Sequence, residues 1–382
     1  AAISGVSTGT SFYYSEVGHF KFLTQGVYDD TYTAVDIANG DCDNATAPFD
    51  SSGSGTPKKY GCRFGNTVDS SYFGRFIPSL FTVTPSTSTL ACGSFVYYGQ
   101  DALVSSTSSV ITPFTVTAKN AANVVTQNYT GAYGKLVLSD YASSQYYFTS
   151  ELSNGASLIP SVVSPNVTQQ TNNSIPTWGN GTVDVKVKHK ISRPASAINE
   201  QNITVYAQPK DADNVTTTSK VALTGTFPVR YGRVAITPAH GSELLPLSVP
   251  IEAQYYKSGA YLRNTLDSCS TFNLSTMAMK NYKGNLNACE TILSGTASMS
   301  SGKMSLTLSA PKVGTDGKPN TGSVDLDLNY GAAGGDQTCV SIVQSNAADG
   351  DGSKTLWFGA DPSARASFGI YKAPVIYMRE NF

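Results

Sequence analysis

Charge is scarce in this sequence. Of its 382 residues only 14% are charged, and 26 basic residues nearly balance 27 acidic ones, for a net charge of −1. An ordinary soluble domain has about 25% charged residues. A nucleic-acid-binding protein needs a basic face that neutralises phosphates, and a disordered chain needs high net charge with few aromatic residues. With 22 Tyr and 16 Phe the chain fits neither class, so we expect no nucleic-acid partner.

Long apolar runs are also missing. The most apolar stretch, residues 244–251, is interrupted by Pro246 and Pro250 and is far shorter than the ~20 residues of a membrane-spanning helix. The sequence starts at Ala1, without Met or a basic and apolar leader. This start is typical of an exported chain whose signal peptide has been removed. We therefore expect an extracellular or cell-surface protein that does not span the membrane.

Residues suited to catalysis or metal binding are few. The three histidines, His19, His189 and His240, are widely separated, and the sequence has no G-x-S-x-G motif of a serine hydrolase. Residues 240–243 (HGSE) place reactive side chains together, but neighbours on a strand or turn point in different directions. We interpret this segment as a structural turn, and we expect no enzymatic activity and no cofactor.

The six cysteines favour disulfides. None lies in a C-x-x-C pair or beside a histidine at zinc-like spacing, and an even number in an exported chain is typical of disulfide bonding. Six cysteines allow 15 pairings, among which the sequence does not choose. Short sequence separation favours Cys42 with Cys62, and Cys269 with Cys289, and it leaves the partners open for two others, Cys92 and Cys339.

What replaces charge is a strand-forming and turn-forming composition. The chain has 87 Ser and Thr, 23 Asn and 34 Gly. Residues 182–191 alternate three valines with an aspartate and two lysines, and residues 251–255 and 324–328 alternate in the same way. This period of two predicts strands with one buried and one solvated face. The expected fold is all-β, with two or three immunoglobulin-like or jelly-roll-like sandwiches and little helix.

Two segments with an aromatic-Gly-Arg core, residues 73–76 and 231–233, each lie between predicted strands. We place domain limits beside them, because the resulting pieces have an ordinary domain size. Residues 1–75 then form an N-terminal β module, residues 76–229 a central sandwich and residues 230–382 a C-terminal sandwich.

Several ordered motifs carry a resemblance to a known family. They are residues 73–83 (FGRFIPSLFTV), 91–100 (ACGSFVYYGQ), 231–256 (YGRVAITPAHGSELLPLSVPIEAQYY) and 364–382 (ARASFGIYKAPVIYMRENF). The sequence resembles the C-terminal region of MshQ-type proteins, which are encoded with the mannose-sensitive haemagglutinin class of type IV pili. The resemblance implies an exported, pilus-associated β module. That region has no known function, so the resemblance brings no catalytic residues.

The first eleven residues are small and nearly uncharged, and Val6, Thr8, Thr10 and Phe12 alternate as one face of a strand. Such an arm has two interpretations. It is a frayed chain end, or it is an assembly arm that adds to an open sheet edge of a neighbouring copy, as in donor-strand complementation.

Acidic loops and sequons mark further candidate sites. Asp349 and Asp351, in a D-G-D-G loop, are weak candidates for calcium ligands, and so are the Asp pairs at 211/213 and 41/43. An Asp/Gly turn explains each of them as well. Eight N-x-S/T sequons are candidate glycosylation sites: Asn44, Asn128, Asn166, Asn172, Asn180, Asn202, Asn214 and Asn273.

The leading hypothesis is a non-enzymatic structural subunit of an extracellular, pilus-like fibre. Identical copies would join head to tail, and a charge-poor surface lowers the repulsion between them. The alternative is a monomeric pilus-associated adhesin or carbohydrate-binding module that recognises cell-surface or glycan ligands. In that case Trp178, Trp357 or some of the many Tyr would form sugar platforms.

Overall fold

The fold is built from strands. The structure is a computed structural model that describes residues 12–24, 27–29, 62–64, 68–100, 110–138, 149–150, 158–162, 176–272, 277–295, 298–328, 339–340 and 357–369. Regular structure in these ranges consists of β-strands and one 3₁₀ turn, η1 (Gly131–Tyr133). The expected all-β fold class is confirmed. No helix of the described part is long and apolar enough to cross a bilayer.

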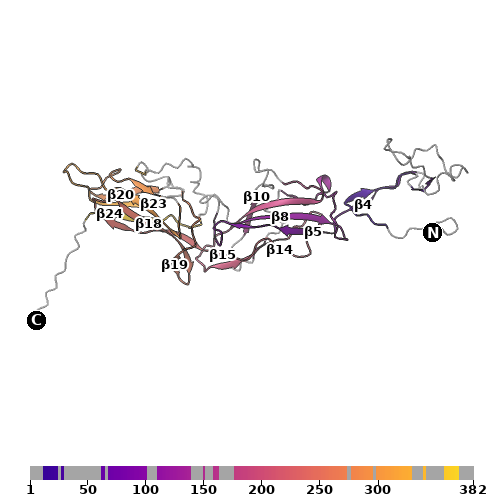
Figure 1. Cartoon of the computed structure of the whole chain (residues 1–382), viewed down its shortest axis with the longest axis horizontal. Helices are drawn as coiled ribbons and strands as arrows, with labels where there is room; N and C mark the ends of the chain where they lie inside the picture. Colours follow the sequence, from indigo (N-terminus) through magenta and orange to yellow (C-terminus); the bar gives the residue numbers. More distant parts are fainter. Residues whose placement is uncertain are drawn as a thin grey trace.

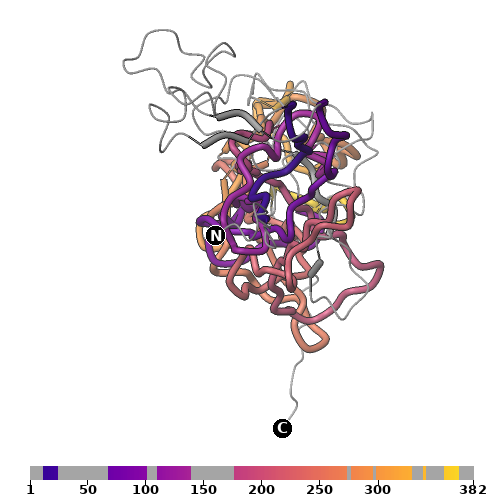
Figure 2. The backbone as a smooth tube through the Cα atoms, turned by 90° about the vertical axis from the view of Figure 1, so that its right-hand side faces the viewer, coloured from indigo at the N-terminus to yellow at the C-terminus, as the bar shows by residue number. Residues whose placement is uncertain are grey.

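Two β-sandwiches follow one another along the molecule, with a short ribbon beyond the first (Figure 1). In the view of Figure 2, turned by 90°, the two sandwiches lie one behind the other. Each sandwich has its own cluster of buried side chains. The described chain is therefore a rod with two cores.

The first sandwich packs one five-stranded sheet against two three-stranded sheets. The large sheet has the order β10-β11-β8-β5, and β6 pairs with β8. Its strands are β5 (Leu80–Pro85), β6 (Thr89–Leu90), β8 (Val110–Lys119), β10 (Leu158–Val162) and β11 (Thr182–Ile191). The smaller sheets contain β7 (Val96–Tyr97), β9 (Thr149–Ser150), β12 (Gln201–Ile203), β13 (Val205–Ala207), β14 (Val221–Ala222) and β15 (Phe227–Arg230).

Alternation along β8 and β11 builds the core of this sandwich. Every second residue of β8 is buried, and β11 buries Val183, Val185 and Val187 as its sequence predicted. His189 follows on the same face and is completely buried, with Nε2 at 2.7 Å from the hydroxyl oxygen of Thr112. Burial lowers the pKa of His189 to about 3, so this histidine is neutral and belongs to the core.

The second sandwich packs the sheet β16-β18-β22-β21, with β19 on β18, against the sheet β17-β24-β23-β20. The first sheet contains β16 (Gly232–Ile236), β18 (Leu247–Lys257), β19 (Ala260–Arg263), β21 (Leu293–Gly295) and β22 (Lys303–Leu308). The second contains β17 (Ala239–Gly241), β20 (Met277–Gly284), β23 (Gly322–Leu328) and β24 (Ser363–Phe368). The predicted alternations at 251–255 and 324–328 fall in β18 and β23 and supply Ile251 and Leu326 to the core.

A ribbon at the N-terminal end pairs β1 (Gly18–Phe20) with β4 (Phe73–Phe76), and β2 (Val27–Asp29) pairs with β3 (Cys62–Phe64). The carboxylate of Glu16 attaches the ribbon to the first sandwich, because it accepts the backbone N–H groups of Gln127 and Asn128 at 3.2 and 3.0 Å. Arg75 of β4 forms a bidentate ion pair with Asp213.

The strand directions define two ends of the rod. β18 runs from Leu247 to the seam between the sandwiches, where the N–H of Tyr256 donates to the carbonyl of Tyr231. The turn before Leu247 is therefore at the far end of the second sandwich. We call this end, formed by residues 241–246, 309–322 and 367–369, the tail, and the opposite end, formed by residues 12–24 and 68–77, the head.

Candidate functional site

The seam between the sandwiches is organised by a four-residue apolar run, Phe95 to Tyr98. All four side chains are completely buried, yet they divide between two cores. Val96 and Tyr98 belong to the first sandwich, whereas Phe95 and Tyr97 belong to the second. Successive side chains of a strand point to opposite faces. β7 therefore lies between the cores and contributes one face to each.

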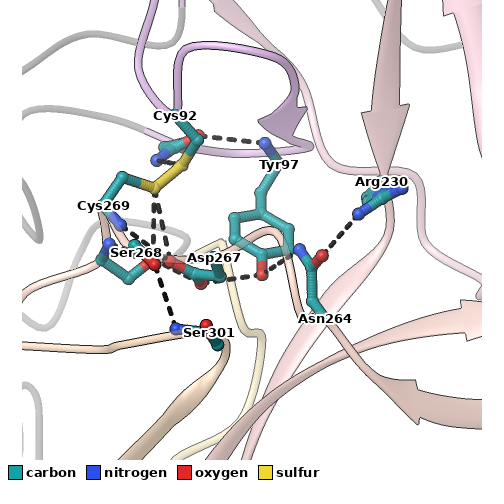
Figure 3. Close-up of a disulfide and its surroundings, with 10 residues drawn as sticks. Cys92, Tyr97, Arg230, Asn264, Asp267, Ser268, Cys269 and Ser301 are labelled. Carbon is teal, nitrogen blue, oxygen red and sulfur yellow. Dashed lines mark hydrogen bonds between the residues drawn. A yellow bond between two sulfur atoms is a disulfide. The ribbon is translucent and has the colours of Figure 1, made fainter.

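Tyr97 is the central side chain of the seam (Figure 3). Its ring stacks on Trp357, with ring centroids 4.0 Å apart and an angle of 10° between the planes. Its hydroxyl donates to Oδ2 of Asp267 at 2.9 Å and accepts from the side-chain amide of Asn264 at 2.6 Å. Burial and the nearby charge of Asp267 raise the pKa of Tyr97 well above its usual value. The phenol thus stays protonated and acts as a donor.

Asp267 accepts several hydrogen bonds from neighbouring groups. Besides the Tyr97 hydroxyl, it accepts the backbone N–H and the hydroxyl of Ser270, both at 2.9 Å, and the backbone N–H of Cys269 at 3.2 Å. A buried carboxylate is tolerated when hydrogen bonds replace its hydration. Asp267, Asn264 and Tyr97 are all inaccessible to solvent. This network consequently fixes the seam and does not reach a substrate.

Two arginines of the first sandwich cross the seam. Arg193 donates to the carbonyl oxygens of Trp357 and Gly232, and its guanidinium lies 3.7 Å from the ring centre of Tyr231. Arg230 donates to the amide oxygen of Asn264 and forms an ion pair with Glu200 at 2.6 Å. Planar guanidinium groups combine hydrogen bonding with stacking on rings. Both arginines thereby hold the sandwiches in one relative orientation.

A disulfide closes the seam covalently. Cys92 of the first sandwich is bonded to Cys269 of the second, across 177 residues of sequence, and Cys289 is bonded to Cys339 across 50 residues. The pairing of Cys269 with Cys289 that sequence separation favoured is therefore wrong. The fold brings distant segments together at the seam, which a criterion of loop length cannot detect. Cys42 lies outside the described residues, so its pairing with Cys62 stays a prediction.

One group of potential metal ligands occurs at the seam. Ligand atoms of Cys92, Asp267 and Cys269 lie within 4.8 Å of one another. Both sulfurs belong to the disulfide, and the carboxylate is saturated with hydrogen bonds. Metal binding by cysteine needs thiolates, so these residues do not fit a metal ion.

The head exposes an aromatic patch. We call the six residues that line a hollow of about 360 Å³ there the head patch: Phe12, Tyr13, Tyr14, Phe20, Phe22 and Phe76. Tyr14 and Phe20 pack on Phe76, with ring centroids 4.9 and 5.8 Å away. Tyr13 and Phe12 are 94% and 75% exposed. The head thus presents aromatic faces and edges to solvent.

The tail has a different surface. Leu244, Leu245 and Val313 are exposed there, beside a hollow of about 300 Å³ that we call the tail hollow. Its lining residues are Lys283, Gly284, Thr321, Gly322, Ser323, Arg365, Phe368 and Gly369. Eight of the fifteen exposed large apolar side chains among the described residues lie in the head, and these three lie at the tail. The exposed apolar surface is therefore concentrated at the ends of the rod.

Family models account for both sandwiches. The model of the third domain of DUF6701 matches residues 61–228, and that of the fourth domain matches residues 230–381. The chain carries two domains of the DUF6701 family. These matches make no specific link to MshQ-type proteins. The Cys92–Cys269 disulfide joins the third DUF6701 domain to the fourth.

No curated protein matches the chain. Two solved adhesin structures are similar to it. The Escherichia coli adhesin FdeC has 11% identity and a TM-score of 0.26, with 70% of this chain and 64% of that chain covered. The Yersinia pseudotuberculosis adhesin InvE has 10% identity and a TM-score of 0.23, with 77% and 60% covered. The chain thus spans less than two thirds of either protein, and similarity at this level carries no argument about function.

Trp357 is buried against Tyr97, so it cannot form the sugar platform considered from the sequence. Trp178 is half-buried and packs in the first sandwich with Tyr129, at 4.7 Å between ring centroids. A platform that includes Trp178 stays a prediction. Of the predicted assembly arm, Val6, Thr8 and Thr10 lie outside the described residues, and Phe12 belongs to the head patch.

The 240–243 segment forms the end of β17 and a turn. His240 pairs in register with Ser367, and the Ser242 hydroxyl accepts the N–H of Leu244 at 3.2 Å. Asp211 accepts the hydroxyl of Tyr129 at 2.6 Å, and Asp213 pairs with Arg75. These two carboxylates thus bond to protein groups, whereas the calcium candidates Asp349, Asp351 and the pair at 41/43 lie outside the described residues.

Four of the eight sequons are described, and the asparagine of each is exposed: Asn128, Asn180, Asn202 and Asn214. The other four, Asn44, Asn166, Asn172 and Asn273, lie outside the described residues. These four side chains are accessible to a glycosylating enzyme. Glycosylation at the four positions stays a prediction.

Sequence reasoning missed the seam residues, although one signal was present. Residues 95–98 read FVYY, an apolar run with no polar residue in alternation. Such a run is typical of a strand that is buried on both faces. It indicates a strand between two cores, and it predicts that the domains on either side are in contact.

Proposed function

We propose that this DUF6701 protein is an exported, non-enzymatic structural subunit of an extracellular, pilus-like fibre, in which identical copies join head to tail. The third and fourth domains act as one rigid segment of the fibre. The observation that carries this proposal is the seam, where a disulfide, a buried hydrogen-bond network and two arginines hold the domains together.

A fixed seam gives a rod whose two ends keep a constant relation. Domains joined by a single linker move relative to one another unless their interface is large and apolar. A subunit that transmits its orientation to the next copy needs such a constant relation, because a heterologous contact repeated at a fixed angle generates an open filament. The exposed apolar residues at both ends, and a net charge of only −1, favour contacts between identical copies.

The oxidised protein, purified from an exporting host, tests this function. We expect short filaments in negative-stain micrographs and a sedimentation coefficient that rises with protein concentration. A strictly monomeric field at high concentration would overturn the proposal.

The N-terminal arm, residues 1–11 with Val6, Thr8 and Thr10 on one strand face, is proposed to strengthen the contact by adding to a sheet edge of the next copy. Deleting residues 1–11 is expected to abolish or shorten filaments. Filaments of unchanged length would exclude strand donation and leave the fibre itself in place.

A second candidate function is favoured by the exposed rings of the head. Tyr13 and Tyr72 are strongly exposed, and tyrosines present an apolar body with a polar tip, which suits carbohydrate or protein ligands. A pilus-associated adhesin would bind glycans as a monomer. A glycan array probed with the monomeric protein separates the two functions. Glycan binding that the Tyr13→Ala variant loses, together with an absence of filaments, would support the adhesin.

A further inference from the structure

We propose that the head patch of one copy docks on the tail hollow of the next copy, with aromatic rings of the head packed against the glycine backbone and the cationic side chains Lys283 and Arg365. This inference rests on the proposed fibre function and names the two surfaces that would form its repeating contact. The occupant of the tail hollow is thus a second copy of this chain.

The chemistry of the tail hollow suits aromatic side chains. Lys283 is exposed at its rim, and Arg365 is held in place by two hydrogen bonds to Asp325, at 2.8 and 3.0 Å. Phe368 also lines the hollow, but its side chain is buried in the core of the second sandwich. Three of the eight lining residues are glycines with positive φ, Gly284, Gly322 and Gly369. A surface with glycine backbone and two cations accepts the face of a phenyl or phenol group.

The head patch supplies that partner. Its six aromatic residues leave Tyr13 and Phe12 almost fully exposed, and an aromatic side chain that becomes buried loses about 150–250 Å² of accessible surface. Tyr14, Phe20 and Phe76 are already half-buried, so Phe12, Tyr13 and Phe22 supply most of the aromatic surface that a contact can cover. Exposed side chains elsewhere in the head, Leu23, Tyr72 and Phe73, extend this surface toward the ~800 Å² per partner of a stable protein interface.

The same pairing of a cation with a ring already joins the two sandwiches of one copy. At the seam Arg230 of β15, in the first sandwich, lies 4.4 Å from the ring centre of Tyr255 of β18, in the second. The interface between domains within a copy and the proposed interface between copies would thus use one kind of contact. Head and tail differ in chemistry, and the cations of the tail complement the aromatic rings of the head.

The positions of the head patch and the tail hollow determine which assembly their contact forms. The head patch and the tail hollow lie at opposite ends of the rod. A contact between two different surfaces is heterologous, and it adds one copy after another into an open filament when the rotation between copies does not close a ring.

Cysteine cross-linking tests the contact. Tyr13→Cys and Lys283→Cys are prepared separately in the oxidised protein, and a short bis-maleimide is added to each variant alone and to their mixture. We expect covalent dimers in the mixture at least tenfold above either variant alone. Dimers of Tyr13→Cys alone would show a head-to-head contact and overturn the proposal. Slow maleimide labelling of monomeric Lys283→Cys would also overturn it, because the hollow would then be covered by its own chain.

Charge reversal gives an independent readout. Lys283→Glu and Tyr13→Ala are expected to raise the critical concentration of assembly at least tenfold. The matched controls Lys257→Glu and Leu262→Ala change exposed residues of the β18–β19 hairpin at the seam and are expected to stay within twofold of the unmodified protein. Normal filaments with no cross-link and no effect of Lys283→Glu would refute this contact while the fibre function stands. Absence of filaments from the unmodified protein would refute the fibre function.

Discussion

The ring of Tyr97 lies flat on the indole of Trp357, 4.0 Å away, although the two residues belong to different domains and are far apart in the sequence. Trp357 is 1% exposed, so this stack replaces water on both rings. The core of the fourth domain is therefore incomplete without a residue of the third. The two domains share one cooperative structure at this point.

Tyr97→Phe should destabilise the protein by about 1–3 kcal/mol, because the carboxylate of Asp267 and the amide of Asn264 lose a buried partner. Tyr97→Ala should cost about 3–5 kcal/mol, since it also leaves a cavity against Trp357. Urea denaturation measures both values. Tyr13→Phe, which removes an exposed hydroxyl, is the control and should leave the unfolding midpoint unchanged. Equal midpoints for Tyr97→Phe and the unmodified protein would contradict the role assigned to the network.

Gly232→Ala should separate the two domains slightly. An added Cβ would lie 2.6 Å from a ring carbon of Tyr97 and 2.7 Å from ring carbons of Trp357, so the stacked pair must shift, at a cost of about 1–3 kcal/mol. Gly225→Ala is a matched control, because nothing lies within 4 Å of its added Cβ. Thermal unfolding should show a lower midpoint for Gly232→Ala only, and a similar loss in both variants would indicate a backbone effect unrelated to the seam.

Replacing Cys92 and Cys269 together by Ala should uncouple the domains. The disulfide closes a loop of 177 residues, whose loss corresponds to at most about 5 kcal/mol in the chain-entropy model. We expect the single unfolding transition of the oxidised protein to divide into two. The control variant lacks Cys289 and Cys339. It loses a disulfide within the fourth domain and should keep the two domains coupled. Calorimetry measures the number of unfolding transitions. A single transition in the Cys92/Cys269 variant would contradict the role of this disulfide in coupling the domains.

His189 should make the stability depend on pH. Its folded pKa of about 3 lies below the unfolded value of 6.5, so the unfolded state binds an additional proton between these values, and stability falls as the pH drops through this window. From pH 7 to pH 5 the expected loss is about 2 kcal/mol. Urea titrations at the two pH values measure it.

The control for this effect is His189→Gln, which keeps a polar side chain near Thr112 and cannot be protonated. Its stability should change little between pH 7 and pH 5. The carboxyl groups of Asp213 and Asp325, whose pKa values are lowered by hydrogen bonds from Arg75 and Arg365, contribute stability that is lost only at lower pH. An equal loss in the variant and the unmodified protein would assign the pH dependence to another group.

The sequence predicted the strands better than the contacts between them. Alternation at 182–191 specifies which face of β11 is buried, because a strand repeats every two residues, and the structure agrees. The Cys92–Cys269 bond could not be predicted in this way. It depends on how the 92–98 segment is placed between two cores, and no local period contains that information.

The head patch was only partly visible in the sequence. The alternation that ends at Phe12 predicts a strand face, and the aromatic-Gly-Arg motif at 73–76 predicts a domain limit. The structure brings Phe12 and Phe76 to one hollow, because β1 and β4 are paired. Pairing between segments more than 50 residues apart has no signal in either segment alone.

The Cys92–Cys269 bond also sets how the molecule responds to tension. When the two ends of the chain are pulled apart, the covalent path passes from Cys92 directly to Cys269, and the segment between them, which spans a sequence separation of 177, is not extended. That bypassed length corresponds to roughly 600 Å of fully extended chain. Most strands of the third domain and the first strands of the fourth lie in the bypass. With this bond intact, a pulled molecule therefore extends by far less than the full contour length of its chain.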